Sequence, residues 1–259
     1  MIEICALASG SNGNCYYIGN DRDAVLVDAG ISRRQVLERM KERRLDPSKV
    51  RAVLISHEHA DHFKGIRVLS KHLNVPVFMT RPAYEKSWGP NRPAKISYFD
   101  PGDVIKIGGF NIHTFLKQHD AAEPCSFRIE HDGLNVGVMT DIGEPCENVF
   151  RHFSQCQAMF LESNYDEDML WNGPYPGYLK NRVSSGYGHL SNKQASELLE
   201  KHGGDDLQVV FLSHLSAENN RPEVALDEFA RLKDRFLVKL TNRHNPAEIF
   251  TLSKKEVAF

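Results

Sequence analysis

Ser56-His57-Glu58-His59-Ala60-Asp61-His62 places three histidines and an aspartate within six residues. The stretch follows the apolar run Ala52-Val53-Leu54-Ile55, which predicts a buried strand. A turn leaving that strand would carry four metal-competent side chains, because imidazole nitrogens suit zinc, manganese or iron and carboxylates suit harder ions. We therefore interpret the stretch as half of a two-metal site, with His57 and His59 directed at one ion and Asp61 and His62 at a second.

Single ligand-type residues recur downstream at the ends of predicted strands. His119 follows an apolar run ending at 117, Asp141 follows 136–140, and His214 follows 209–213. A lone histidine at a strand end is more often structural than a ligand. Four such ends, all carrying histidine or aspartate, favour one shared site over an accidental cluster. Two ions about 3.5–4 Å apart could activate a water molecule there and stabilise the attacking and leaving oxygens.

Three further residues carry two interpretations each. Glu162 follows the strand predicted over 157–161, and His189 precedes the helix predicted from Ser191 to His202. Such a pair could be an oriented proton donor, or an ordinary buried hydrogen bond beside a helix start. Asp28 ends the strand predicted over 24–30, where it could orient a metal-bound histidine or cap the next helix.

The loop Ser9-Gly10-Ser11-Asn12-Gly13-Asn14 lies between the first two predicted strands. Its glycines remove side-chain bulk, so its backbone N–H groups could approach an anion, with side-chain donors from its serines and asparagines. The alternative is a simple connection between strands. We predict a substrate-phosphate contact, with Asn219 as a further candidate.

Composition limits the function classes. The chain has 259 residues and a net charge of −2, so any nucleic-acid contact must use a local patch. Its five cysteines form no CxxC pair and indicate free thiols in a reducing compartment. No apolar run approaches a membrane helix, and no secretory signal is visible at the start. We expect one cytoplasmic domain over residues 1–259.

The remaining pattern mixes strands and helices. A helix capped by Ser32 is expected, and others over 63–72 and 81–88 and from about 222. Strands are expected over 2–8, 15–18, 76–79, 95–99, 103–107, 110–116, 125–131, 134–140, 237–240 and 247–252.

The His57-x-His59-x-Asp61-His62 motif resembles the metallo-β-lactamase-fold superfamily, and His119, Asp141 and His214 follow in that superfamily's order. The resemblance implies an α+β fold, a four-layer αββα sandwich with the metals at one edge. It also implies the ligand sets: His57, His59 and His119 on one metal, Asp61, His62 and His214 on the other, and Asp141 bridging.

Within the superfamily, Phe160-Leu161-Glu162 and Gly188-His189-Leu190-Ser191 resemble motifs of tRNase Z-type nucleases, in which the pair helps protonate the leaving group. Only 22 positions separate His119 from Asp141, which leaves no room for that family's tRNA-grasping arm. The loop from Ser9 and the stretch 213–220 look like the YycJ/WalJ group, which is associated with 5′-to-3′ exonuclease activity on DNA.

The leading hypothesis is a phosphodiesterase with two divalent ions, zinc or manganese, that acts on the 5′ end of DNA. His189, Glu162 and Asp61 are the expected catalytic residues. An RNA-processing nuclease, or a hydrolase of small esters, thioesters or lactones, is the alternative. A binding module that lost its metals is disfavoured by seven intact candidate ligands.

Overall fold

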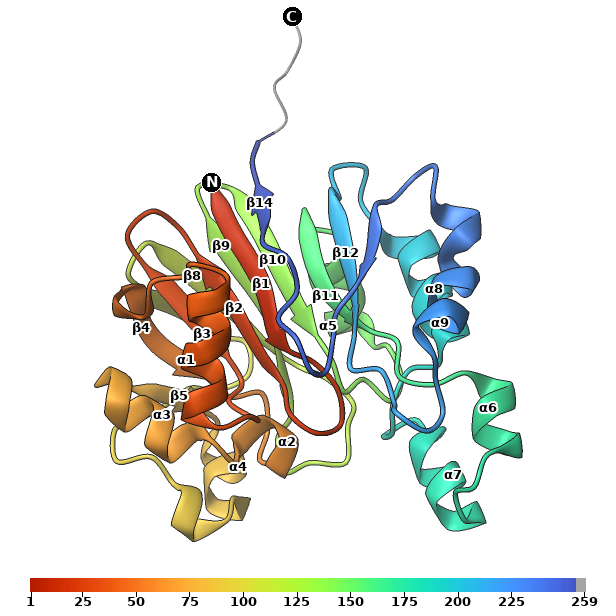
Figure 1. Ribbon diagram of the computed structural model, residues 1–259, viewed down its shortest axis with the longest axis horizontal. Coiled ribbons are helices and arrows are strands. Elements are labelled where there is room, and N and C mark those ends of the chain that lie inside the picture. Colours follow the sequence, from red (N-terminus) through yellow and green to blue (C-terminus); the bar gives the residue numbers. More distant parts are fainter. Residues whose placement is uncertain (255–259) are drawn as a thin grey trace, which may run out of the picture.

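A computed structural model describes residues 1–254, which form two seven-stranded sheets (Figure 1). The first sheet has the order β14-β1-β2-β3-β4-β5-β6. Its strands are β1 (Ile2–Ala8), β2 (Cys15–Gly19), β3 (Ala24–Val27), β4 (Val50–Leu54), β5 (Val77–Met79), β6 (Ile96–Tyr98) and β14 (Phe250–Leu252). The second sheet has the order β13-β12-β11-β10-β9-β8-β7. Its strands are β7 (Val104–Ile107), β8 (Phe110–Leu116), β9 (Cys125–His131), β10 (Leu134–Met139), β11 (Ala158–Glu162), β12 (Val209–Ser213) and β13 (Val238–Leu240).

Helices cover the outer face of each sheet. Helices α1 (Arg33–Glu42), α3 (Ile66–Leu73) and α4 (Arg81–Lys86) share a buried apolar cluster with the first sheet. Helices α5 (Glu147–Phe153), α8 (Asn192–His202) and α9 (Pro222–Phe229) share another with the second. Together with the two sheets these helices make four layers, which confirms the predicted αββα sandwich.

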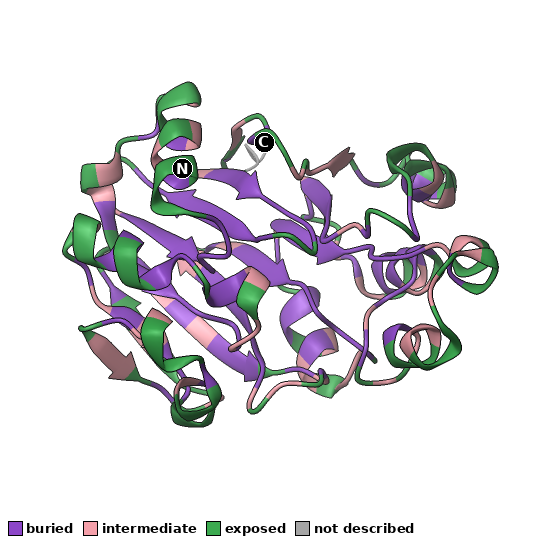
Figure 2. Cartoon of the chain, turned by 60° about the horizontal axis from the view of Figure 1, so that its bottom comes forward, coloured by how far each residue is buried: buried purple, intermediate pink, exposed green. Residues whose placement is uncertain are grey.

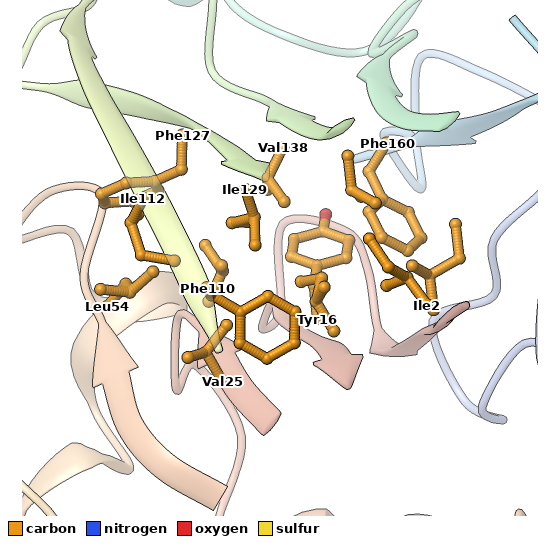
Figure 3. Close-up of a cluster of buried hydrophobic side chains, with 14 of the residues drawn as sticks. Ile2, Tyr16, Val25, Leu54, Phe110, Ile112, Phe127, Ile129, Val138 and Phe160 are labelled. Carbon is orange, nitrogen blue, oxygen red and sulfur yellow. The ribbon is translucent and has the colours of Figure 1, made fainter. Parts of the chain in front are cut away.

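A third apolar cluster fills the space between the sheets (Figure 3). Strand β1 shows how the sequence builds it. Ile2 and Ile4 join this inner cluster, whereas Cys5 and Leu7 join the cluster beneath the helices. Successive side chains of a strand point to opposite faces, so β1 is apolar at every position except Glu3 because both of its faces are covered. Figure 2 shows most of the strands as the buried centre, with most exposed residues on the outer helices and loops.

Several elements differ from the sequence predictions. The helix expected over 63–72 is two helices, α2 (Ala60–Phe63) and α3, separated at Gly65. A Cβ at Gly65 would lie 2.0 Å from the Ile31 carbonyl oxygen, so glycine permits this close approach. Helices α5, α6 (Glu167–Asn172) and α7 (Gly177–Val183) were not predicted. The last strand is shorter than expected and begins at Phe250.

Strand direction gathers several chain segments at one edge. β10, β11 and β12 are parallel, and β8 runs in the same direction because β9 is antiparallel to both β8 and β10. β3, β4 and β5 are likewise parallel in the first sheet. None of the helices in residues 1–254 is long and apolar enough to cross a membrane.

Candidate metal centre

The loop after β4 carries four of the candidate ligands. His57 follows the strand, His59 is the N-cap of α2, and Asp61 and His62 lie in that helix. His57 and His62 are fully buried. A Cβ at Gly30 would lie 1.5 Å from the Asp61 carbonyl oxygen, so the glycine after β3 lets α2 pack against the sheet edge. The compact turn points these side chains inward.

The second sheet contributes one candidate ligand at each of three strand ends: His119 after β8, Asp141 after β10 and His214 after β12. Asp141 and His214 have φ angles of 55° and 58°. Residues other than glycine rarely adopt this left-handed backbone conformation, and those held in it cluster at functional sites. Asp28, with φ 63°, is a third example beside the same site.

The seven candidate ligands lie in one place. Ligand atoms of His57, His59 and His119 fall within 4.8 Å of one another, and so do those of Asp61, His62 and His214. We call these the first and second ligand groups. Asp141 reaches both groups, with one oxygen 3.2 Å from His62 Nε2 and the other 3.8 Å from His119 Nε2 and 3.5 Å from His214 Nε2.

The histidines are oriented by hydrogen bonds at Nδ1. Asp28 Oδ2 accepts from His62 Nδ1 at 2.7 Å, and Ser56 Oγ lies 2.9 Å from His57 Nδ1. His119 Nδ1 donates to the Gly188 carbonyl oxygen at 3.0 Å. Fixing Nδ1 in this way leaves Nε2 to face the site, which is the usual arrangement of a metal-ligating histidine. Asp28 therefore makes the contact expected of an orienting residue.

The chemistry of these atoms suits metal ions. His57 Nε2 is buried and has no hydrogen-bond partner among residues 1–254, as a vacant ligand nitrogen would. Burial lowers the pKa of His57 well below its usual range and that of His119 to about 4, so both rings are neutral and offer a lone pair. The clusters of histidine and aspartate can thus bind metal.

The second group carries more negative charge. Burial alone would lower the pKa of His214, but Asp141, Asp61 and Glu162 raise it to about 10. Burial would likewise raise the pKa of Asp141, but His214 and His62 hold it well below its usual range. The carboxylates stay ionised and attract positive charge. A bound divalent ion would supply that positive charge.

The buried Glu162 pairs with the partly buried His189 next to Asp141. His189 Nδ1 donates to Glu162 Oε1 at 2.7 Å, and the backbone N–H groups of Ile142 and Leu190 donate to Glu162 Oε2. Burial would raise the pKa of Glu162, but His189 and His214 lower it to about 2. Glu162 Oε1 also lies 3.2 Å from His214 Nδ1, so one carboxylate orients two histidines. The sequence did not predict this second contact.

The comparisons agree with this geometry. Residues 23–215 match the family described as "Beta-lactamase superfamily domain". The chain belongs to the metallo-β-lactamase superfamily. It is 34% identical to "Exodeoxyribonuclease YycJ" of Bacillus anthracis over 231 residues, 86% of each chain, and 32% identical to "Exodeoxyribonuclease WalJ" of Streptococcus pneumoniae over 228 residues, 85% of this chain and 83% of that one.

Solved structures show the same fold. The metallo-β-lactamase-fold protein YhfI from Bacillus subtilis superposes with a TM-score of 0.71 at 19% identity, covering 96% of this chain and 100% of that one. The short form of human tRNase Z superposes with a TM-score of 0.66 at 12% identity, covering 95% and 98%. These structures show the metallo-β-lactamase fold. Together with the family match and the two exodeoxyribonuclease relatives, they identify the chain as a hydrolase of that fold, as the sequence predicted.

The loop after β1 makes hydrogen bonds that bear on the predicted substrate-phosphate contact. The Ser9 Oγ accepts from the His214 N–H at 2.8 Å, and Asn14 Nδ2 lies 3.3 Å from Asp61 Oδ2 and 3.1 Å from His62 Nε2. The Gly10 and Gly13 N–H groups donate within the loop, to Asn14 Oδ1 and the Gly10 carbonyl oxygen.

Ser9 and Asn14 thus hydrogen-bond to ligand residues, whereas the Gly10 and Gly13 N–H groups are engaged within the loop. Ser11 and Asn12 are exposed. A cleft opens beside the candidate ligands, and Ser11 is the one residue of the loop that lines it.

That cleft has a volume of about 200 Å³ and reaches both ligand groups. Asn219 lines it, and neither polar atom of its buried amide has a hydrogen-bond partner in the described chain. Sequence reasoning missed other lining residues, namely Asn164, Tyr175, Leu179, Arg182, Val183 and Ser216. It also missed Asp120, whose carboxylate lies 3.4 Å from His119 Nε2.

Proposed function

We propose that this hydrolase is a metal-dependent phosphodiesterase acting on nucleic acid, and more narrowly a 5′-to-3′ DNA exonuclease. The observation that carries the proposal is the Glu162–His189 pair beside the two ligand groups. A phosphodiester releases a sugar hydroxyl, which is a poor leaving group and needs a proton. A site with an oriented proton donor beside metal ligands suits that reaction, and the exodeoxyribonuclease names of the two relatives support it.

Two divalent ions, zinc or manganese, are proposed in the two ligand groups, with Asp141 between them. When bound, they would supply an activated water molecule and neutralise charge on the phosphate oxygens. His189 gives its proton to the leaving oxygen as the phosphorus–oxygen bond breaks. The oxygen of water bonds to phosphorus in the same step, and the proton that this water loses passes to solvent, which later returns a proton to His189. Glu162 keeps His189 in position through the hydrogen bond to its Nδ1. Asp61 serves as both ligand and catalytic residue, because loss of either ion stops the reaction.

Ser11 and Asn219 are the remaining candidates for contact with a terminal 5′-phosphate. Ser11 is exposed beside the cleft, so its hydroxyl is free to donate. The buried Asn219 amide would gain a partner from a bound phosphate oxygen. Both contacts would position a strand end without reading base sequence.

We also propose that residues 1–259 form one domain in the cytoplasm. Side chains from both sheets build the inner apolar cluster, so neither sheet has a complete core alone. All five cysteines are free thiols, which suits a reducing compartment.

The test is hydrolysis by purified protein loaded separately with zinc and manganese. Substrates are DNA and RNA labelled at either end, and p-nitrophenyl acetate as a small ester. We expect metal-dependent release of nucleotides from the 5′ end of DNA, faster with a 5′-phosphate than with a 5′-hydroxyl. The Ser11→Ala/Asn219→Ala double variant should reduce that preference. His72→Ala, which removes an exposed histidine from α3, is the control. Ester hydrolysis without cleavage of either nucleic acid would contradict the proposal.

A further inference from the structure

The segment between β11 and α8 stands outside the sandwich and covers one side of the cleft. Its helices α6 and α7 project from the body at the same end as α2 (Figure 1). A small apolar cluster of its own includes Tyr165, Leu170 and Val183. The segment is thus packed against itself, while Leu179 and Arg182 of α7 line the cleft.

Arg182 brings a cation to the cleft. Its Nε lies 2.6 Å from Asp120 Oδ2, and Asp120 Oδ1 lies 3.4 Å from His119 Nε2 of the first ligand group. The Arg182 side chain is 53% exposed. A guanidinium has five N–H donors in a planar fork, so the pair with Asp120 leaves donors for a phosphate that approaches the ligand groups.

Two exposed aromatic rings flank this ion pair. Tyr178 is 76% exposed and precedes Arg182 by four residues on α7, so both side chains lie on one face of the helix. Tyr187 is 61% exposed, and its carbonyl oxygen accepts from the Asp120 N–H at 3.0 Å. Single exposed aromatics are common. Here two of them lie next to the Arg182–Asp120 pair, one through its place on α7 and one through its backbone, and Arg182 itself lines the cleft.

We propose that Tyr178, Tyr187 and Arg182 bind unpaired nucleotides, so that the substrate is a single-stranded end and not a blunt duplex. This inference rests on the proposed action on nucleic acid and narrows its substrate class. Exposed aromatic rings stack on unpaired bases of any sequence, and a nearby cation holds the backbone phosphate. Bases in a duplex are already stacked on each other and would need to separate before they could use these rings.

The experiment compares kcat and KM of the metal-loaded protein on a single-stranded oligonucleotide and on a blunt hairpin. In Tyr178→Ala/Tyr187→Ala we expect KM for the single strand to rise roughly 10-fold or more, with a much smaller change for the hairpin. Tyr178→Phe/Tyr187→Phe should keep the parent KM, because stacking needs the ring and not the hydroxyl. The control is Tyr98→Ala, which removes a partly exposed tyrosine from the edge strand β6 of the first sheet.

Three results would overturn the inference: an alanine variant no weaker than Tyr98→Ala, equal losses on both substrates, or a phenylalanine variant as weak as the alanine one. Metal content and melting temperature, measured on every variant, show whether a loss comes from unfolding. If no nucleic acid is hydrolysed, the proposed function fails. Fluorescence anisotropy with a labelled oligonucleotide then tests the binding surface alone, and parent-like affinity in the alanine variant would refute it.

Discussion

The two sheets supply the candidate metal centre in different ways. The first sheet gives four ligands from one turn after β4, all within six residues. The second sheet gives His119, Asp141 and His214, each at the end of a different strand. The histidines of the first sheet are oriented by Asp28 and Ser56, their neighbours at the same sheet edge. His214 depends on Glu162 and Asn164 from the second.

Ligands that come from one turn and ligands that come from several strands depend on different parts of the fold. A turn can present several ligands wherever its strand lies, so the first half depends on local geometry. The second half exists only because β8, β10, β11 and β12 end at the same edge. Asp141 is the place where the two halves meet, since its oxygens face His62 on one side and His119 and His214 on the other. Substitutions can therefore separate the halves.

The largest effect is expected at Asp141. Asp141→Ala should lower the affinity for both ions, and reduce hydrolysis by more than the ~10- to 100-fold typical for losing an outer partner of a ligand. His59→Ala removes a ligand from the first group alone, so it should leave the second ion in place. Metal content per chain, measured by mass spectrometry, distinguishes the two variants. An Asp141→Ala protein that keeps both ions would show that the groups are independent.

The next effect concerns His189. His189→Ala should slow hydrolysis by ~10²–10⁴-fold while metal content stays that of the parent. On a p-nitrophenyl phosphodiester the loss should be much smaller, because p-nitrophenolate leaves without a proton. Equal losses on the two substrates would assign His189 to binding. Glu162→Gln should differ from His189→Ala by also weakening the metal, because Glu162 contacts His214.

Asp28 tests the first sheet in the same way. Asp28→Asn weakens the charge-assisted contact with His62 Nδ1, and we expect ~10- to 100-fold weaker metal binding. Competition with a chelator gives the affinity directly. Asp23→Asn, which alters an exposed ion pair with Arg51, is the matched control. Unchanged affinity in Asp28→Asn would mean that the packing around His62 holds the ring by itself.

The sandwich was implied by the resemblance to the metallo-β-lactamase-fold superfamily and is confirmed. The seven candidate ligands could be named from the sequence because an apolar strand followed by a ligand-type residue is a local pattern. Sequence reasoning missed α6 and α7, whose six and seven residues carry little periodicity, although it predicted α4, which is equally short. Arg182 was missed with them. The hydrogen bonds of the loop at Ser9–Asn14 could not be predicted for another reason. Its composition suits an anion, but only the folded chain shows that Asn14 and Ser9 already bond to the ligands' neighbourhood.

The smallest effect concerns how accessible the buried cysteines of the two sheets are to a thiol reagent. The buried cysteines are Cys5 and Cys15 in the first sheet and Cys125 in the second, with Cys156 before β11. Burial raises the pKa of Cys5, Cys125 and Cys156 to about 12, and raises that of Cys15 as well.

At pH 8 these thiols stay protonated and out of reach, so only the half-buried Cys146 should react with Ellman's reagent in the native protein. All five should react after unfolding. Cys146→Ser should abolish the fast reaction, and mapping any additional labelled cysteine by mass spectrometry would identify which sheet opens. Labelling of Cys125 or Cys156 ahead of Cys5 and Cys15 would show that the second sheet, whose site residues are spread over four strands, is the less stable half.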